Sequence, residues 1–230
     1  MEKRIGREIA RVTGREGGQV KPKTPSLDLM EYIERNILPR YAHFDRAHSM
    51  EHVTRVIRSS LELAALTGAD VDMVYAIAAY HDIGMEGPRA IHHITGGRII
   101  AADKQLRRWF SEEQIRIMRE AVEDHRASAS RAPRSIYGKI VAEADRDLEP
   151  IHVIKRAVEY GVDHYPHLDK EGQWERFRSH VRGKYGVGGY MRLWIPGSRN
   201  ARYLRQLQEI IADEGQLRQA FERLYDEESR

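Results

Sequence analysis

The chain has 230 residues, of which 41% are hydrophobic and 32% are charged, a balance typical of one globular domain with or without an appendage. It contains no cysteine, which excludes disulfides, thiol catalysis and metal sites with thiolate ligands, so any metal must be held by histidine, carboxylate or water. The net charge of +3 fits an anionic substrate but is too small to indicate nucleic-acid binding.

Residues 1–26 are predicted to form an extension or linker that is separate from the domain. The segment is charged, has no apolar signal core, and ends in a stretch rich in Gly, Pro and Lys. No apolar run in the chain approaches the roughly 20 residues of a membrane span. We therefore expect a cytoplasmic protein that has no membrane partner.

From residue 27 to about residue 160, the apolar residues recur with the period of an α-helix. Ser26 is expected to cap the first helix of this region, and Gly68 is expected to end the second. No segment alternates as a half-buried strand would. The sequence therefore predicts an all-α domain over 27–160, with helical segments at 27–41, 49–68, 70–84, 91–106, 111–125, 134–148 and 152–161.

Residues 161–230 are predicted to form a C-terminal helical extension that packs on this domain. The Gly-rich segment 183–198 reads as either a lid or a connection. Residues 200–228 are strongly helical, with a break near Gly215 and one apolar face, formed by Tyr203, Leu207, Ile210, Leu217, Phe221 and Leu224. We favour packing of this face on the domain, and the alternative is a homodimer formed through the C-terminal helix.

Six side chains of the types that bind metals fall on the apolar stripes of five different predicted helices. A single histidine on such a stripe is usually an ordinary core residue, and a single aspartate could pair with an arginine. Taken together, however, the six would leave many buried polar groups without partners, and one or two divalent cations would satisfy them all. We therefore predict a metal site formed by His52, His81, Asp82, His92, His125 and Asp145.

The ligand types also narrow the choice of metal. Imidazole and carboxylate ligands without sulfur favour manganese, iron, cobalt or nickel over magnesium, and zinc also fits. The segment "HSMEH" has two histidines four residues apart, as in a zinc protease. In that motif the glutamate directly follows the first histidine, whereas Glu51 here directly precedes the second, so the segment is not that motif.

The order of these residues resembles the HD superfamily of metal-dependent phosphohydrolases. The resemblance covers about residues 41–150 and rests on three segments: "HVTRV" at 52–56, "AAYHDIG" at 78–84 and "VAEADRDL" at 141–148. It implies an all-α bundle of at least five helices around a metal centre held by His52, His81, Asp82 and Asp145. It also implies hydrolysis of a phosphate ester or anhydride.

Two further segments, "IHHITGG" and "EDHRAS", resemble the extra histidine positions of binuclear HD proteins, which implies that His92 and His125 hold a second ion. No Gly-Tyr-Pro signature follows the His–Asp pair, so the chain departs from the branch that hydrolyses cyclic dinucleotides. The residues after 160 resemble no family that we can name.

The expected function is hydrolysis of a small phosphorylated metabolite or nucleotide, in which metal-bound hydroxide attacks phosphorus. Asp82 is expected to bridge the two ions. His48, one turn before His52, is expected to protonate the leaving oxygen or bind the phosphate, with an ordinary helix residue as the alternative. Arg89 and Arg126 adjoin ligand positions and are expected to hold phosphate oxygens, with surface arginines as the alternative.

Two other functions fit the same residues. Some HD proteins are di-iron oxygenases, and the same six ligands would serve that chemistry. The second alternative is a metal-stabilised module that binds a nucleotide or a partner without turnover. The aromatic residues of the C-terminal region allow weak contact with nucleic acid, but nucleic acid is not an expected partner.

Overall fold

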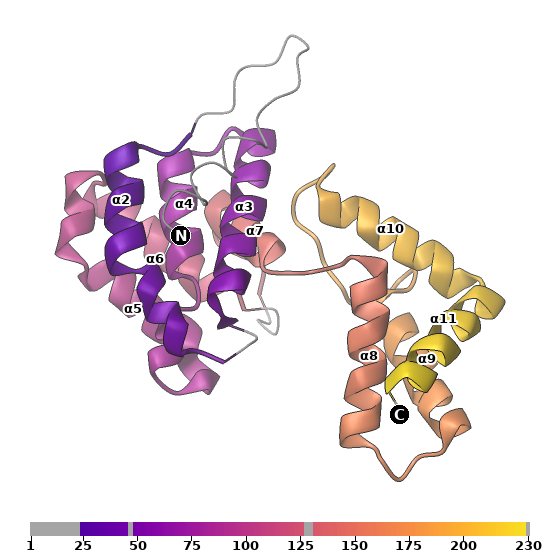
Figure 1. Ribbon diagram of the computed structural model, residues 1–230. Helices are drawn as coiled ribbons and strands as arrows, with labels where there is room; N and C mark the ends of the chain where they lie inside the picture. The colour runs from indigo at the N-terminus through magenta and orange to yellow at the C-terminus, as the bar shows by residue number, and fades with distance from the viewer. Residues whose placement is uncertain (1–23, 46–47, 127–130, 229–230) are drawn as a thin grey trace. The chain divides into compact units, whose positions relative to one another are not determined.

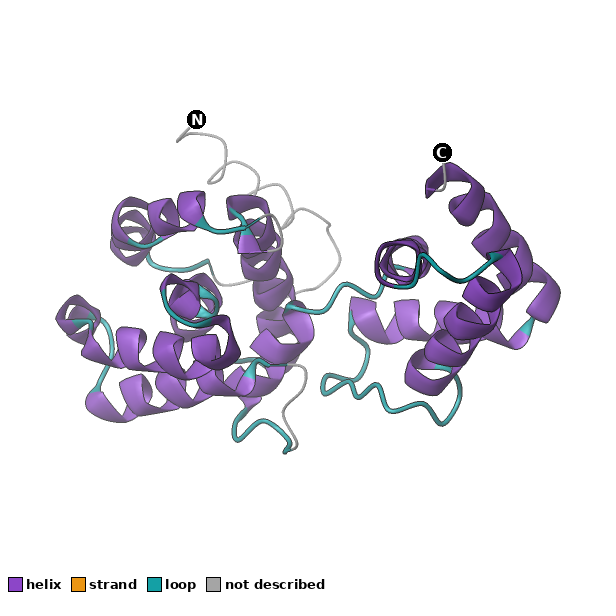
Figure 2. Cartoon of the chain, turned by 90° about the horizontal axis from the view of Figure 1, so that it is seen from below, coloured by secondary structure: helices purple, strands orange, loops and turns teal. Residues whose placement is uncertain are grey.

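The computed structural model describes residues 24–45, 48–126 and 131–228, and all regular structure among them is helical (Figures 1 and 2). The prediction of an all-α fold is therefore confirmed. The chain divides into two compact units, Met1–Asp145 and Arg146–Arg230. No helix among the described residues has the length and apolar character needed to cross a membrane.

The first unit contains six α-helices among its described residues, joined in part by short 3₁₀ helices. The α-helices are α2 (Leu27–Asn36), α3 (Met50–Thr67), α4 (Val71–Tyr80), α5 (His92–Ala102), α6 (Glu112–Asp124) and α7 (Ile136–Ala144). The 3₁₀ helices are η1 (Leu38–His43), η3 (Ile83–Glu86), η4 (Arg89–Ile91) and η5 (Lys104–Arg108).

Helix α4 is the centre of this unit. All of its residues from Met73 to Tyr80 are buried, as expected for a helix that is apolar on every side. It packs against α3, α6 and α7. Because the helix runs through the core, the two residues that follow it, His81 and Asp82, are buried as well.

The ends of two helices test the predicted boundaries. Gly68 ends α3 in the left-handed conformation, with φ of 70°, and this prediction is confirmed. Ser26 stands at the cap position of α2, but its side chain makes no capping hydrogen bond. Its hydroxyl and backbone N–H instead donate to the carboxylate of Asp72, at 3.0 Å and 2.7 Å, and so tie the start of α2 to the start of α4.

Close backbone packing brings α5 against the core. A Cβ atom on Gly84 would lie 1.9 Å from the carbonyl oxygen of His92, and one on Gly97 would lie 2.8 Å from the Cγ of Glu123. Glycine is therefore required where η3 meets α5 and favoured where α5 meets α6. This packing brings the start of α5 close to the residues that follow α4 and α6.

The second unit consists of α8 (Pro150–His164), α9 (Lys170–Tyr185), α10 (Arg199–Ala212) and α11 (Glu214–Glu228). Its core contains the rings of Trp174, Phe177 and Phe221, with ring centroids 5.2–5.9 Å apart. The predicted apolar face of 200–228 is used in this core: Leu207, Leu217, Phe221 and Leu224 are buried there, and Tyr203 and Ile210 pack against it. The predicted break falls at Asp213, between α10 and α11.

The division between the units lies at residue 145, whereas the sequence pattern placed the end of the domain at 160. The reason is that α8 buries Val153, Ile154, Ala157 and Val158 in the core it shares with α9 and α11. The Gly-rich segment predicted as a lid or a connection links α9 to α10 within the second unit. Packing of the C-terminal helices on the first unit stays a prediction, and the proposed linker 1–26 lies almost wholly outside the described residues.

Candidate metal centre

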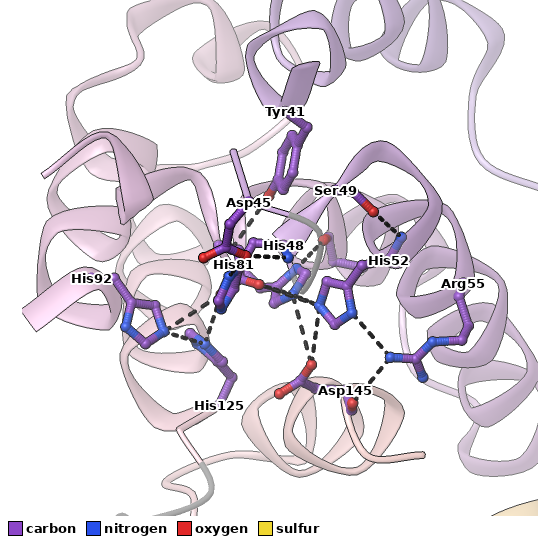
Figure 3. A network of polar contacts seen from close by, with 12 residues as sticks. Tyr41, Asp45, His48, Ser49, His52, Arg55, His81, His92, His125 and Asp145 are labelled. Atoms are coloured by element: carbon purple, nitrogen blue, oxygen red, sulfur yellow. Dashed lines mark hydrogen bonds and ion pairs between the residues drawn. The ribbon is translucent and has the colours of Figure 1, made fainter. Parts of the chain in front are cut away.

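The six side chains expected to bind metal meet in one place in the first unit, at the ends of five helices (Figure 3). His52 lies in the first turn of α3, and His92 is the first residue of α5. The other four directly follow the last turns of α4, α6 and α7: His81, Asp82, His125 and Asp145. The apolar periodicity had placed these four within helices, and the structure corrects this.

One half of the cluster is formed by His52, His81, Asp145 and one oxygen of Asp82. The Nε2 atom of His52 lies 3.1 Å from Nε2 of His81 and 3.2 Å from Oδ2 of Asp82. It also lies 3.2 Å from Oδ1 of Asp145. Ligand atoms at right angles around an ion, each about 2.1 Å from it, are about 3 Å apart. These spacings therefore suit four ligands of a single cation.

The other half is formed by His92, His125 and the second oxygen of Asp82. Oδ1 of Asp82 lies 3.5 Å from Nε2 of His92 and 3.3 Å from Nε2 of His125. The two imidazole nitrogens are 3.1 Å apart. Asp82 thus directs Oδ2 toward the first half and Oδ1 toward the second, which is how a carboxylate bridges two ions.

Three of the four imidazoles are oriented in the same way. The Nδ1 atoms of His81, His92 and His125 lie 2.8, 2.8 and 2.6 Å from the backbone carbonyl oxygen three residues earlier. A carbonyl oxygen can only accept, so Nδ1 carries the hydrogen and the lone pair of Nε2 faces the cluster. In the second half, two such lone pairs face each other beside a carboxylate oxygen. Only a proton or a metal between them satisfies this arrangement, so these residues fit a cation.

The carboxylates of the cluster stay ionised. Burial raises the pKa of Asp82, but the attraction of His81 and the hydrogen bond with His125, when these rings are protonated, outweigh burial, and the pKa lies well below its usual range. Desolvation likewise opposes ionisation of Asp145, but the hydrogen bond from His52 and the charge of His81 lower its pKa to about 2. The C-terminal ends of α4, α6 and α7, which are the negative ends of the helix dipoles, add to the negative charge of these carboxylates.

The imidazoles respond to these carboxylates. Burial lowers the pKa of His52, but its hydrogen bonds to Asp145 and Asp82 outweigh burial and raise the pKa to about 9. Burial also opposes the charge on His125, while the hydrogen bond to Asp82 raises its pKa. In His92 desolvation prevails and the pKa is lowered. The centre therefore stabilises a positive charge, most strongly between His52 and the two carboxylates.

A cavity of about 240 Å³ opens onto the cluster. Its lining among the described residues consists entirely of polar and charged side chains: His48, His52, Asp82, His92, His125, Arg126 and Asp145. Two of the residues expected to act on substrate, His48 and Arg126, thus face this cavity. The guanidinium of Arg126 also donates to the backbone oxygen of Ala90, at 2.7 Å, which fixes its position.

Arg89, the third of these residues, is not part of the cavity lining. Its side chain is 66% exposed, and its Nη1 lies 2.9 Å from Oδ2 of Asp45. The other carboxylate oxygen of Asp45 lies 2.7 Å from Nδ1 of His48. Asp45 therefore orients His48, and Arg89 orients Asp45. Asp45 was not predicted from the sequence, and the only signal for it was its position three residues before His48.

Arg55 was also missed. Its Nη2 lies 3.0 Å from Nδ1 of His52 and 3.4 Å from the backbone oxygen of Asp145. The sequence signal was again a spacing, since residues three apart on a helix are neighbours on its surface. Arg55 thus links α3 to the end of α7 on the side of His52 that faces away from the cluster (Figure 3).

Comparison with known families agrees with this geometry. The family model for the HD domain matches residues 50–148, a range that includes all six residues of the cluster. Residues 50–148 thus match the HD domain, a family that consists mostly of metal-dependent hydrolases. No curated protein and no solved structure matches the chain.

Proposed function

We propose that the chain is a metal-dependent phosphohydrolase that acts on a small phosphorylated metabolite or nucleotide. The observation that carries this proposal is the position of Asp82, whose two oxygens lie 3.1–3.5 Å from imidazole nitrogens of two different pairs of histidines. Such a carboxylate is suited to hold two divalent cations side by side at the floor of a polar cavity. Manganese, iron, cobalt and nickel suit this set of ligands best, and zinc also fits.

The protein's own residues divide the work between holding cations and holding substrate. His52, His81 and Asp145 would hold one cation, His92 and His125 would hold the other, and Asp82 would be shared between them. When bound, such ions acidify a coordinated water and polarise a phosphoryl oxygen. The backbone carbonyls behind His81, His92 and His125 keep their Nε2 lone pairs directed into the cluster, where the ions would bind.

The cavity walls supply the contacts to the phosphate group. Arg126 lines the cavity with its guanidinium fixed by the carbonyl of Ala90, and we assign to it the binding of phosphoryl oxygens. We assign to His48 either the binding of the phosphate or the protonation of the leaving oxygen. Asp45 accepts from Nδ1 of His48 and thereby leaves Nε2 free for that role. Arg89 acts only through Asp45.

The test is metal analysis of the purified protein combined with a phosphate-release screen over nucleotides and sugar phosphates. We expect up to two divalent ions per chain and release of phosphate from at least one substrate. Asp82→Asn keeps the shape of the side chain but removes its charge, and it should abolish both metal binding and phosphate release. The matched control is Asp163→Asn, which removes a charge from an exposed position on α8 and should change neither property.

Three outcomes would contradict the proposal. Oxygen uptake by an iron-loaded sample, with no phosphate release from any substrate, would identify an oxygenase instead. Full metal content with neither activity would identify a metal-stabilised binding module. Retention of metal and activity by Asp82→Asn would mean that this carboxylate does not hold the ions.

A further inference from the structure

Exposed aromatic rings gather in the second unit, where α8 ends and the chain turns toward α9. Tyr160, His164, Tyr165 and His167 are all exposed there, and only one other tyrosine among the described residues, Tyr190, is exposed. The ring of His164 is stacked on that of Tyr160, with centroids 4.0 Å apart and planes inclined by 13°. The ring of Tyr165 lies 6.2 Å from that of Tyr160 and 6.3 Å from that of His167. Rings gathered in this way favour a binding surface.

A guanidinium without a carboxylate partner lies beside these rings. It belongs to Arg176 of α9, which packs side by side with α8 (Figure 1). Its Cζ atom is 6.0 Å from the ring centroid of Tyr160 and 5.7 Å from that of Tyr165. Its Nη2 donates to the backbone oxygen of Ala157, and its Nε is buried without a hydrogen-bond partner among the described residues. The positive charge is therefore held in place by neutral groups and is available to an anion.

Two further basic side chains continue from Arg176 along α9. His180 and Lys184 follow at intervals of four residues, so the three lie on one face of the helix. Burial lowers the pKa of His180, and the positive charges of Lys184 and Arg176 lower it further, so the three are within electrostatic reach of one another. Within the described part of the chain, neither Arg176 nor Lys184 forms an ion pair, and Nζ of Lys184 lies over the ring of Tyr185. The row of basic side chains is therefore not neutralised.

The opposite side of α9 differs from this row. Arg178 donates to Glu175 and Glu214, and Arg182 donates to Glu214. Residues two apart on an α-helix point about 200° apart, so these two arginines face away from the row. Residues 176–208 contain eight arginines and lysines and no aspartate or glutamate. The net charge of +3 for the whole chain does not show this segregation of charge.

We propose that the second unit binds single-stranded nucleic acid, with bases stacked on the exposed rings at the end of α8 and phosphates held by Arg176 and Lys184. A single strand exposes the flat faces of its bases, which stack on aromatic side chains whatever the sequence. It also carries a regular series of negative charges, which suits a row of basic side chains without acidic partners. A duplex hides the faces of its bases, and an acidic protein supplies charge without such faces. This binding requires neither metal nor phosphate release and is independent of the proposed function.

The probe is a fluorescein-labelled oligothymidylate of about 15 nucleotides, a length within the range that single-strand-binding folds cover. Its binding to the full chain is measured by fluorescence anisotropy at several salt concentrations. We expect the affinity to fall as salt rises. Three unlabelled competitors should each compete at least about tenfold less well than the unlabelled oligothymidylate: a duplex of the same length, an abasic strand of the same length, and thymidine monophosphate.

The contribution of the rings is tested at Tyr160. Tyr160→Leu keeps an apolar side chain but removes the ring, and it should weaken binding at least about fivefold because a base loses its stacking partner. The charges are unchanged in this variant, so the slope of log affinity against log salt should equal that of the wild type. The matched control is Tyr160→Phe, which keeps the ring and should bind as the wild type does.

The contribution of the charges is tested at Arg176 and Lys184. Arg176→Met and Lys184→Met should each weaken binding and reduce the salt slope by about 0.7, the contribution of one phosphate contact to a single strand. The matched control is Arg58→Met, which removes the same charge from an exposed position on α3 and should change neither property. Arg176 also packs against Gly161, so thermal melting verifies that its variant is folded, and Lys184→Met tests the charge if it is not.

The inference is overturned if the duplex or the abasic strand binds as well as the oligothymidylate, because the rings then contribute nothing. Equally strong competition by thymidine monophosphate would identify a site for a mononucleotide instead of a strand. Unchanged binding by both Tyr160→Leu and Lys184→Met would show that the strand binds elsewhere. If Arg58→Met weakens binding as much as Lys184→Met does, the attraction comes from the net charge of the chain and not from this face.

Discussion

The two units of the chain are both helical, but they bury different kinds of side chain. The core of the second unit is formed by aromatic and aliphatic side chains, and the rings of Trp174, Phe177 and Phe221 contact one another. The first unit buries charged and ionisable groups at its centre, where Asp82 is only 3% exposed. The first interior therefore needs positive charge beside its carboxylates, and the second needs only close packing.

The largest effect should come from a cavity in the second unit. Phe221→Ala removes a ring that contacts Trp174, Phe177 and Tyr225, and it should destabilise this unit by about 3–5 kcal/mol. Hydrogen exchange measured by region should show faster exchange in α8–α11 only, with the metal content unchanged. Loss of metal from this variant would show that the two interiors depend on each other.

Removal of the metal should destabilise the first unit and leave the second unit unchanged. An ion present at a hundred times its dissociation constant stabilises the folded state by about 2.7 kcal/mol. Chelation should therefore lower the melting temperature at pH 7.5 and accelerate hydrogen exchange in α3–α7, while α8–α11 keep their protection. If a sample shown by elemental analysis to be metal-free melts at an unchanged temperature, the histidines are ordinary core residues.

A smaller effect is expected where η3 meets α5. In Gly84→Ala the new Cβ would lie 1.9 Å from the carbonyl oxygen of His92, so α5 must move. We expect a loss of about 1–3 kcal/mol in stability and loss of the ion shared by Asp82, His92 and His125. Gly183→Ala in α9 is the control, because its Cβ would meet no atom within 4 Å. Undiminished binding of two ions by Gly84→Ala would mean that this close contact does not position His92.

The all-α fold and the members of the cluster could be predicted from the sequence. Helical periodicity predicted the all-α fold, and the positions of histidine and aspartate on apolar stripes singled out the six side chains that the structure brings together. The exact placement could not be predicted, because a residue just beyond the last turn of a helix continues its stripe as well as one inside it. Four of the six occupy such positions at the ends of α4, α6 and α7.

Other features depend on contacts between distant segments, about which periodicity says nothing. Arg89 was expected to bind phosphate, but it lies within 2.9 Å of Asp45, 44 positions earlier in the chain. The boundary of the first unit was expected at 160, because α8 has the same amphipathic pattern as the helices before it. Only the packing of its buried face on α9 and α11 assigns α8 to the second unit.

The effect that is smallest per step, and that separates the metal-free from the metal-bound first unit, is the change in stability per pH unit. The pKa of His52 is about 9 in the metal-free fold because of Asp145 and Asp82, whereas an unperturbed histidine has a pKa of about 6.5. The protonated ring thus stabilises the metal-free fold fully below pH 6.5, and this contribution is lost as pH rises toward 9. The loss is at most about 1.4 kcal/mol per pH unit for one proton.

With metal the sign is reversed, because the ion must displace that proton. Affinity for Mn²⁺ should rise by up to about tenfold per pH unit between pH 6.5 and 9 and then level off. His92, whose pKa is lowered, is neutral throughout this window and does not contribute, whereas His125, whose pKa is raised, acts in the same direction as His52. Thermal melting at pH 6.5, 7.5 and 8.5, with chelator or with saturating Mn²⁺, should therefore give a gap in melting temperature that widens with pH. If the difference in melting temperature is the same at all three pH values, the ion displaces no proton from His52. Asp82 and Asp145 would then contribute to metal binding without stabilising a proton on His52.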